Sequence, residues 1–317
     1  MKGLTDIPGI RVGHASDYEG ITGCTVVLCD SGAAGGVDVR GSATGTEELG
    51  ALDPGHVAEQ VHAIVLAGGS AFGLEAASGV RRYLEHRGVG FQTGAAVVPI
   101  VPAAILYDLA IGKASARPTR EMGEAAAAAA TTGAVEEGSA GAGTGATVGK
   151  LFGMKQAMKG GVGSSTVALG EGVLVAALVV VNAFGDVRDP QTGKLIAGAR
   201  RAPGSRELAG TEEQMKRGAS GGFDRSTHTT LAVVATNAKL SKVGAAKLAQ
   251  FGSLGMARSI YPVNTMFDGD IVFALSAGSR QADINTLGLA AAEAVAAAIV
   301  RAVKAAKPLG GVPGLAG

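Results

Sequence analysis

The chain has 317 residues and a formal net charge of +1, and 47% of its residues are hydrophobic. This length and hydrophobic content are enough for one or two domains with a large core, and the balanced charge gives no electrostatic reason to expect nucleic acid or an anionic membrane as a partner. The 51 glycines show no three-residue period, which excludes collagen, and the absence of tryptophan predicts packing through small side chains.

The N-terminal sequence and the cysteines indicate a cytoplasmic protein. Residues 1–17 contain no apolar stretch of the kind that a secretory signal has. The most apolar run, residues 172–181, is about half the ~20 residues that span a bilayer, and it is typical of a buried strand. Cys24 and Cys29 are too few for a disulfide framework, so we expect free thiols in the core.

Segments that are rich in β-branched residues and bounded by Gly or Asp predict strands. In chain order these are residues 10–15, 24–30, 62–69, 145–153, 164–170, 173–185, 229–238 and 270–276. Helical patterns are found over residues 72–87, 120–131, 241–258 and 281–306. Because several strands follow one another directly, the order favours an α+β layered architecture over a doubly wound βαβ sheet.

The longest polar connection covers residues 186–228. It is Gly-rich and poorly periodic, with one short helix expected in residues 207–217. Structureless connections longer than ~12–15 residues are uncommon unless they are functional or disordered. Residues 186–228 therefore form either a mobile surface insertion or a loop that delivers its C-terminal end to a site where the chain is cut.

A hydroxyl pair, Thr229 and Thr230, opens the strand that follows this connection. A threonine hydroxyl is a poor nucleophile until a base takes its proton, and a threonine that is itself an N-terminus carries such a base in its α-amine. Internal cleavage before a threonine would create this arrangement. The two threonines face opposite sides of a strand, so alternation alone does not choose between them, and β propensity also explains a threonine pair.

Two further groups could support such a nucleophile. Asp268 and Asp270 stand one Gly apart at the entrance of a strand, where their mutual repulsion would raise one pKa; a simple turn has the same sequence. Asn182 follows the most apolar strand, and its amide is either an oxyanion donor or a turn residue.

The remaining polar motifs carry weaker signals. Residues 67–73, AGGSAFG, resemble a nucleophile elbow, but Phe72 occupies the second glycine position. Lys150 ends a Gly-rich strand segment, where a lysine is by default a surface residue. The five histidines have no ligand spacing, so we expect no metal, and the glycine-rich runs have neither a P-loop nor a G-x-G-x-x-G pattern, so we expect no cofactor.

Several motifs in order resemble the family of L-aminopeptidase/D-Ala-esterase/amidases, which includes β-peptidyl aminopeptidases and nylon-oligomer (6-aminohexanoate-oligomer) endohydrolases. The resemblance covers nearly the whole chain and rests on GLTDIPGIRVGHASD, AIVLAGGSAFGLEAASGV, VPIVPAAILYDL, GAGTGATVGK, KGGVGS, VVVNAFGDV, TTLAVVATNA and FDGD.

The resemblance implies that Thr229 is the nucleophile. It implies self-cleavage between His228 and Thr229 into fragments 1–228 and 229–317 of a single domain, with residues 186–228 as the processing loop. Relatives commonly have Asn or Gly before the nucleophile, where this chain has His228. Asp268 and Asp270 match the family's acidic pair.

Three further residues match the family's active site. Asn182 matches the oxyanion amide, and Lys150 and Tyr107 match residues of the nylon-oligomer branch. A threonine nucleophile with Asp-Gly-Asp also resembles this branch, whereas the aminopeptidase branch has serine with Ser-x-Glu.

The implied fold is a four-layer αββα sandwich, similar to N-terminal nucleophile hydrolases but with different connectivity, and the implied assembly is a homotetramer of processed protomers. The implied activity is hydrolysis of amide bonds in linear oligoamides or peptides. An aminopeptidase or amino-acid amidase, an acyl transferase similar to ornithine acetyltransferases, and an unprocessed binding protein are the alternatives.

Overall fold

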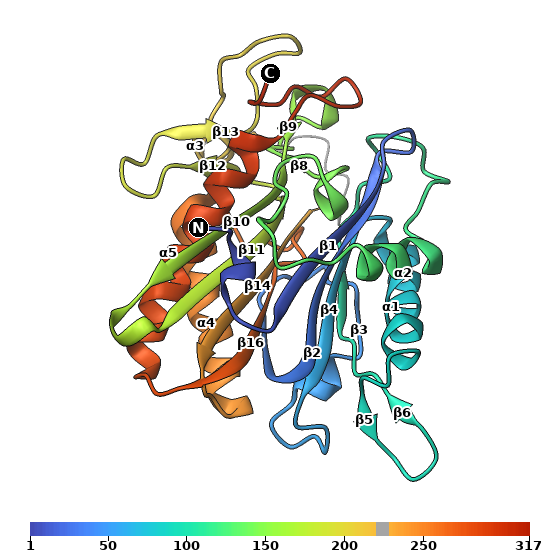
Figure 1. Ribbon diagram of the computed structural model, residues 1–317. Helices are drawn as coiled ribbons and strands as arrows, with labels where there is room; N and C mark the ends of the chain where they lie inside the picture. Colours follow the sequence, from blue (N-terminus) through green and yellow to red (C-terminus); the bar gives the residue numbers. More distant parts are fainter. Residues whose placement is uncertain (220–227) are drawn as a thin grey trace.

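The longest strand, β2 (Thr22–Val39), joins two sheet layers into one continuous sheet (Figure 1). In the computed structural model, which describes residues 1–219 and 228–317, the first half of β2 pairs with β1 and β4 and its second half pairs with β16. Between the halves, Asp30 and Ser31 are exposed and Gly32 has φ +75°, a left-handed conformation that glycine adopts without strain. The strand therefore bends there, and the sheet folds back on itself.

Each layer has its own strand order. One layer runs β10 (Gly161–Ala168), β11 (Leu174–Asn182), β14 (Thr229–Ala238), β16 (Ile271–Arg280) and the end of β2. The other contains β1 (Ile10–Asp17), the start of β2, β4 (Val61–Ala67), β7 (Ala103–Ile105) and β3 (Thr46–Glu47). Only the pairs β14–β16 and β4–β7 are parallel among these neighbours.

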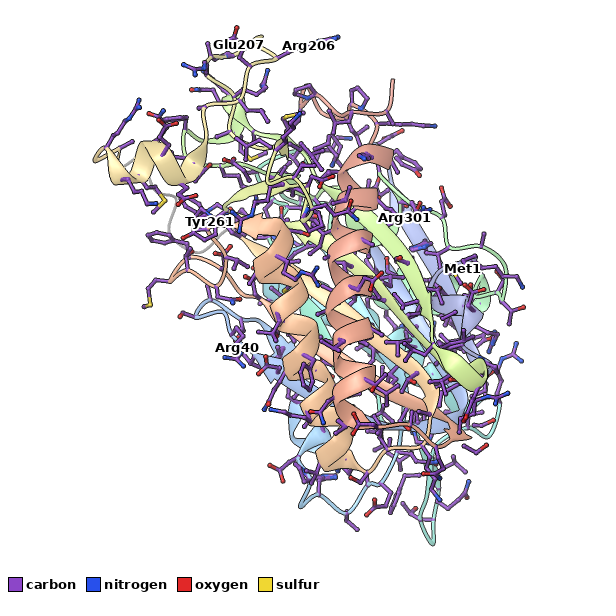
Figure 2. All side chains as sticks on the ribbon, turned by 90° about the vertical axis from the view of Figure 1, so that its left-hand side faces the viewer. Met1, Arg40, Arg206, Glu207, Tyr261 and Arg301 are labelled. Carbon is purple, nitrogen blue, oxygen red and sulfur yellow. The ribbon has the colours of Figure 1, made fainter. Side chains whose placement is uncertain are left out.

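Helices cover the outer face of both layers. α4 (Lys242–Ser259) and α5 (Ile284–Ala305) lie side by side across the first layer (Figure 2), and α1 (Glu75–Glu85) packs with α2 (Arg120–Ala128) on the second. One buried apolar cluster lies between the sheets and one lies between each sheet and its helices. The α+β prediction and the αββα layering are thus confirmed.

Alternation along β11 shows why these strands are apolar throughout. Val180 and Leu178 point into the cluster between the sheets, whereas Val179 and Val181 point toward the helices. Small residues bring neighbouring elements close: a Cβ on Gly255 of α4 would lie 2.4 Å from the carbonyl oxygen of Ala292 on α5. The glycine-rich composition is therefore explained by backbone contact between elements.

α5 is long and apolar enough to cross a membrane by length and composition. However, 67% of its most apolar window is buried inside the structure, where it packs on α4, β10 and β11. Its character is that of a core helix. Cys24 and Cys29 are free and buried, as predicted, and burial raises the pKa of both thiols to about 12.

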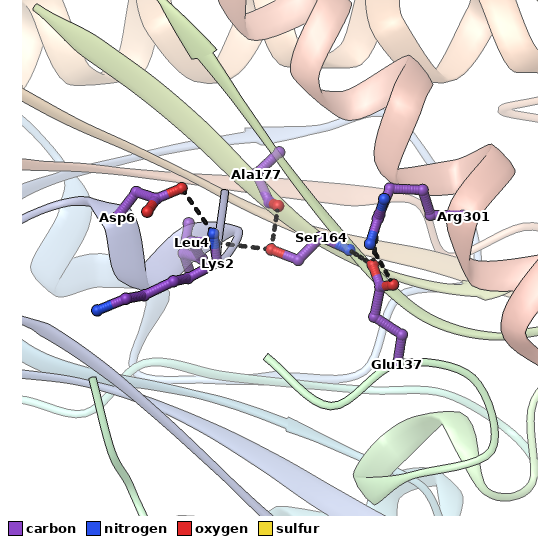
Figure 3. Close-up of polar contacts among 7 residues, drawn as sticks. All are labelled: Lys2, Leu4, Asp6, Glu137, Ser164, Ala177 and Arg301. Carbon is purple, nitrogen blue, oxygen red and sulfur yellow. Dashed lines mark hydrogen bonds and ion pairs between the residues drawn. The ribbon is translucent and has the colours of Figure 1, made fainter. Parts of the chain in front are cut away.

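The N-terminal segment packs against the edge strand β10 (Figure 3). Ser164 donates its hydroxyl to the Ala177 carbonyl and accepts the Leu4 N–H at 2.7 Å. The Ser164 N–H donates to Glu137, which also forms an ion pair with Arg301 of α5. These contacts join the chain start, a loop and a helix to the strand.

Two predicted segments differ from the structure. The strand expected over residues 145–153 is wrong: only β8 (Thr147–Val148) is extended, and it pairs with β9 (Met158–Lys159), because Gly149 and Gly153 have left-handed φ angles that end it. Residues 186–219 carry more structure than their composition indicates, namely β12 (Asp186–Arg188), β13 (Leu195–Ala197) and the expected short helix α3 (Thr211–Lys216).

The remaining elements are short. β12 pairs with β13 and β15 (Ile260–Tyr261), and β5 (Phe91–Gln92) pairs with β6 (Val97–Val98). Single 3-10 turns form at Leu4–Asp6, Leu49–Leu52, Ser70–Leu74, Gly141–Gly143, Met154–Gln156 and Gly170–Gly172. Residues 220–227 of the predicted processing loop lie outside the described residues.

Candidate active site

Strand register brings the predicted nucleophile and the predicted oxyanion amide together. Thr229, the first residue of β14, is the direct partner of Asn182, the last residue of β11, in an antiparallel pair. Directly opposed residues place their side chains next to each other on the same face. On the other side of Thr229, a parallel bridge joins His228 to Asp268 just before β16. The ends of three strands therefore meet at residue 229.

The structure separates the two threonines that alternation alone leaves equivalent. The Thr229 side chain lines a cavity of about 290 Å³ whose other walls include Tyr107 and Ser70. Thr230 is fully buried, and its N–H donates to Asp270 Oδ1 at 2.6 Å. Thr229 is thus the threonine of the pair that lines a cavity.

The acidic pair is buried and lies within reach of the threonines. Asp268 Oδ1 accepts the Phe184 N–H, and its Oδ2 accepts the N–H and the hydroxyl of Thr265. Asp270 Oδ2 accepts the Asn264 N–H at 3.0 Å. Each carboxylate is 1% exposed and is fixed by donors at both oxygens, so neither is free to rotate.

Burial raises the pKa of both carboxyls, most strongly that of Asp270, which reaches about 8. The charge of Asp268 is the second cause for Asp270, and the hydrogen bonds from Thr230 and Asn264 oppose the shift. The charge of Lys150 is among the effects that lower the pKa of Asp268. Together the two buried carboxyls therefore hold a proton more tightly than isolated carboxyls do.

Lys150 is a buried residue and not the surface residue that its place in the sequence indicates by default. It is 8% exposed, and its Nζ donates to the backbone oxygen and to Oδ1 of Asn182, at 3.0 and 2.7 Å. Burial lowers its pKa to about 7, although the charge of Asp268 opposes this. A neutral amine at Lys150 is therefore accessible near neutral pH.

Asn182 connects the site residues to one another. Its Oδ1 also accepts the Thr147 N–H at 3.0 Å, and its Nδ2 donates to the Tyr107 carbonyl at 3.1 Å. The amide is fully buried, so these bonds fix the orientation of its N–H groups. Tyr107 contributes a backbone acceptor to Asn182 and a side chain to the cavity wall.

His228 is held at both its carbonyl and its ring. The carbonyl oxygen accepts the Gly269 N–H at 2.8 Å and the Thr229 hydroxyl at 2.5 Å. Its ring lies 5.1 Å from that of Phe184. Burial and then the charge of Lys150 lower the pKa of the imidazole to about 2, so the ring is neutral.

Two buried charges close to the site were missed by the sequence analysis. Asp108 follows Tyr107 directly and accepts the Gly69 N–H and the Thr22 hydroxyl, both at 2.7 Å. Lys159 donates to the carbonyls of Thr144 and Ala146, immediately before Thr147. Burial lowers the pKa of Lys159 to about 7, and the charge of Asp108 opposes this shift. Their motifs, ILYDL and KGGVGS, are the only sequence signal for them.

The AGGSAFG motif also has a place at this site. Ser70 has φ +54° and lines the cavity beside Thr229, and its N–H donates to the Leu106 carbonyl. The motif therefore supplies part of the cavity wall, at the turn between β4 and α1. Among residues 1–219 and 228–317, no group of three or more His, Cys, Asp or Glu side chains could hold a metal ion.

The fold and this set of groups define an amide-bond hydrolase similar to N-terminal nucleophile hydrolases. The chain belongs to peptidase family S58, whose family model matches residues 2–316. An uncharacterized aminopeptidase of Mycobacterium tuberculosis is 40% identical, over 99% of this chain and 96% of that protein. A 6-aminohexanoate-oligomer endohydrolase of Kocuria sp. is 32% identical, over 94% of this chain and 85% of that protein.

Solved structures show the same fold. The β-aminopeptidase of Burkholderia sp. superposes with a TM-score of 0.71 at 25% identity, covering 99% of this chain and 91% of that one. The L-aminopeptidase D-Ala-esterase/amidase of Ochrobactrum anthropi, described as a variant of the Ntn hydrolase fold, gives 0.75 at 21% identity, covering 98% and 88%. The predicted family is therefore confirmed.

Proposed function

We propose that the chain cleaves itself between His228 and Thr229 and that the freed Thr229 is the nucleophile of an amide hydrolase. The observation that carries this proposal is that five groups meet where β11 ends, β14 starts and β16 is about to start. They are a threonine that lines a cavity, an oriented amide, two carboxyls and a buried lysine.

In self-cleavage, Thr229 Oγ1 attacks the carbonyl carbon of His228. The charge that develops on the carbonyl oxygen meets the Gly269 N–H, which already donates to it at 2.8 Å. The C–N bond breaks, the hydroxyl proton passes to the nitrogen of Thr229, and an ester forms. Water then hydrolyses the ester to a His228 carboxylate and restores the hydroxyl. Lys150 is the proposed proton acceptor, since its pKa of about 7 leaves a neutral amine at physiological pH.

In turnover, the freed α-amine of Thr229 takes over as base, with a reference pKa of about 7.7–8.0. Thr229 attacks the substrate amide, and the amine passes the proton to the leaving nitrogen. Asn182 is the proposed donor to the tetrahedral oxyanion. Asp268 and Asp270 position the amine and balance its charge, because both lie beside the strand start from which it emerges.

The proposed substrates are linear oligoamides or peptides. The Asp-Gly-Asp pattern with a threonine favours oligoamides of the kind that the name of the Kocuria relative describes. The aminopeptidase name of the mycobacterial relatives, which share more of the sequence, supports peptide or amino-acid amides as the second candidate.

Two variants test the nucleophile and two substrate sets test the activity. Thr229→Ala is expected to give one band on a denaturing gel, whereas Thr230→Ala is expected to give two, because the Thr230 side chain faces away from the cavity. Two bands from Thr229→Ala would refute the assignment. Cleaved enzyme is then assayed on 6-aminohexanoate oligomers and on dipeptide amides; hydrolysis of neither would refute the proposed hydrolase.

A further inference from the structure

Two buried charged residues, Asp108 and Lys159, lie behind the proposed oxyanion donor. They are 5% and 1% exposed, and neither is among the residues that line the cavity beside Thr229. Neither takes part in the proposed self-cleavage or turnover. Burying a charge costs folding free energy unless the charge is paired and hydrogen-bonded. Both residues meet these conditions through the two segments that hold the Asn182 amide.

Lys159 fixes the segment that binds the oxygen of this amide. Its ammonium donates to the carbonyl oxygens of Thr144 and Ala146, each at 2.7 Å. The Ala146 carbonyl and the Thr147 N–H belong to one planar peptide group. That N–H donates to Asn182 Oδ1 at 3.0 Å. Lys159 therefore orients the peptide group that Oδ1 meets.

Asp108 fixes the segment that binds the nitrogen of the same amide. The Tyr107 carbonyl, which accepts Asn182 Nδ2 at 3.1 Å, shares a planar peptide group with the Asp108 N–H. The Asp108 carboxylate accepts the Gly69 N–H and the Thr22 hydroxyl, both at 2.7 Å. Burial raises the pKa of this carboxyl, and hydrogen bonds from these two donors and from its own N–H oppose the shift. The carboxylate therefore anchors the peptide group that Nδ2 meets.

The two segments touch at Gly145. This residue stands between the two carbonyls that Lys159 binds, and a Cβ on it would lie 2.5 Å from both Cβ and Oδ2 of Asp108. The absence of a side chain therefore lets the segments pack directly. The two charges also act on each other, since burial lowers the pKa of Lys159 and the charge of Asp108 opposes this. Asp108 and Lys159 thus form one unit around the Asn182 amide.

We propose that Asp108 and Lys159 are positioning residues of the hydrolase, which act by holding both ends of the Asn182 amide. This inference rests on the proposed function, in which Asn182 donates to the tetrahedral oxyanion. An amide that is fixed at its oxygen and its nitrogen need not reorient as charge develops, so the benefit falls on the transition state and not on substrate binding. Loss of the unit should therefore lower kcat and leave KM nearly unchanged.

The first test compares Lys159→Met with Lys242→Met in cleaved enzyme, on 6-aminohexanoate oligomers and dipeptide amides. Lys242 is the matched control, because it is also buried and its ammonium donates to three carbonyls, those of Ala51, His56 and Ala58, at the start of α4. Lys159→Met is expected to lower kcat roughly tenfold with KM within about threefold, and Lys242→Met to keep kcat. Equal kcat values in the two variants would overturn the inference.

Two variants of Asp108 test the other half of the unit. Asparagine can present its oxygen to the Gly69 N–H and its NH₂ group to the Thr22 hydroxyl, which rotates to accept. Asp108→Asn is therefore expected to recover most of the kcat that Asp108→Ala loses. An asparagine variant as slow as the alanine variant would contradict positioning through these hydrogen bonds.

A double-mutant cycle shows whether the effect passes through Asn182. The Asn182→Ala enzyme has no amide left to orient, so adding Lys159→Met to it is expected to change kcat less than about twofold. A further loss of roughly tenfold, as expected for Lys159→Met alone, would show that Lys159 acts elsewhere and would overturn the inference.

Hydrogen exchange separates this inference from the proposed function. Backbone exchange over residues 144–148 is expected to be faster in Lys159→Met than in wild type, and unchanged in Lys242→Met, because only the first loses the bonds that hold this segment. Unchanged exchange in Lys159→Met would contradict the linkage. Faster exchange in a protein that hydrolyses no amide would leave the linkage to Asn182 standing and refute the hydrolase.

Discussion

Gly269 offers a graded perturbation of the self-cleaving geometry. It stands between the two carboxyls, and its N–H donates to the His228 carbonyl. Its φ is not left-handed, so alanine is compatible with the backbone there. A Cβ at this position would nevertheless lie 2.8 Å from Thr229 Oγ1 and 2.6 Å from the Ala43 carbonyl oxygen. Gly269→Ala therefore pushes directly on the proposed nucleophile.

The size of the effect follows from these distances. Ordinary contact of a Cβ begins near 3.4 Å, so the hydroxyl and the new methyl must separate by about 0.6 Å (3.4 minus 2.8). A misplacement of about 1 Å costs roughly 10²-fold in rate, which gives roughly tenfold for this shift. Overpacking also costs about 1–3 kcal/mol of unfolding free energy.

The assay is a time course of self-cleavage of freshly purified precursor on a denaturing gel. The control is Gly50→Ala, because a Cβ there meets nothing within 4 Å and the backbone φ is not left-handed. Gly269→Ala is expected to be about tenfold slower while it still unfolds cooperatively. Cleavage of a folded Gly269→Ala protein at the rate of Gly50→Ala would refute the role of this geometry.

Three further changes probe the same site. Asn182→Ala should lower kcat of the cleaved enzyme by ~10²–10³, the usual cost of a lost oxyanion donor. The control Asn237→Ala, at the far end of β14, should lose stability but keep its kcat. Equal losses of kcat in the two variants would contradict Asn182 as the oxyanion donor. The self-cleavage rate should rise with pH through about 7, because the Lys150 ammonium loses its proton there. Lys150→Arg should remove this rise. A pH-independent rate in the wild type would count against Lys150 as the base. Burial lowers the pKa of Lys159 to about 7 from its ordinary value of 10.5, so between these pH values the unfolded state binds more protons than the folded state. The unfolding free energy of the wild type, relative to that of Lys159→Met, should therefore increase from pH 7 toward pH 10. A decrease over this range in denaturant titrations would contradict the burial of Lys159.

The fold was largely predictable because its layers follow local patterns. A strand that is apolar on both faces, such as β11, is readable from its run of valines, and Thr229 was recognised as the start of β14. The bend of β2 was not predictable, because the strand pattern gives no sign that its two halves pair with different partners. The strand predicted over residues 145–153 was wrong for a related reason. The composition there is strand-like, but the segment forms a turn that places Lys150 in the site.

The residues that form the site could be predicted from the sequence more readily than their arrangement in space. Alternation could not choose between Thr229 and Thr230, since the choice depends on which face meets a cavity formed by residues more than 100 positions away. The burial of Lys150 and Lys159 could not be predicted from the sequence either. Isolated lysines are normally exposed, and these two are buried because their ammonium groups donate to backbone carbonyls from distant parts of the fold. Contacts between residues far apart in the sequence therefore determine both which threonine lines the cavity and why the two lysines are buried.

An intact-mass spectrum of the purified protein measures both whether the chain is cut and where. The account predicts two species with the masses of residues 1–228 and 229–317, and a single full-length species for Thr229→Ala. A wild-type chain that stays whole after long incubation, or a cut between Thr229 and Thr230, would contradict it.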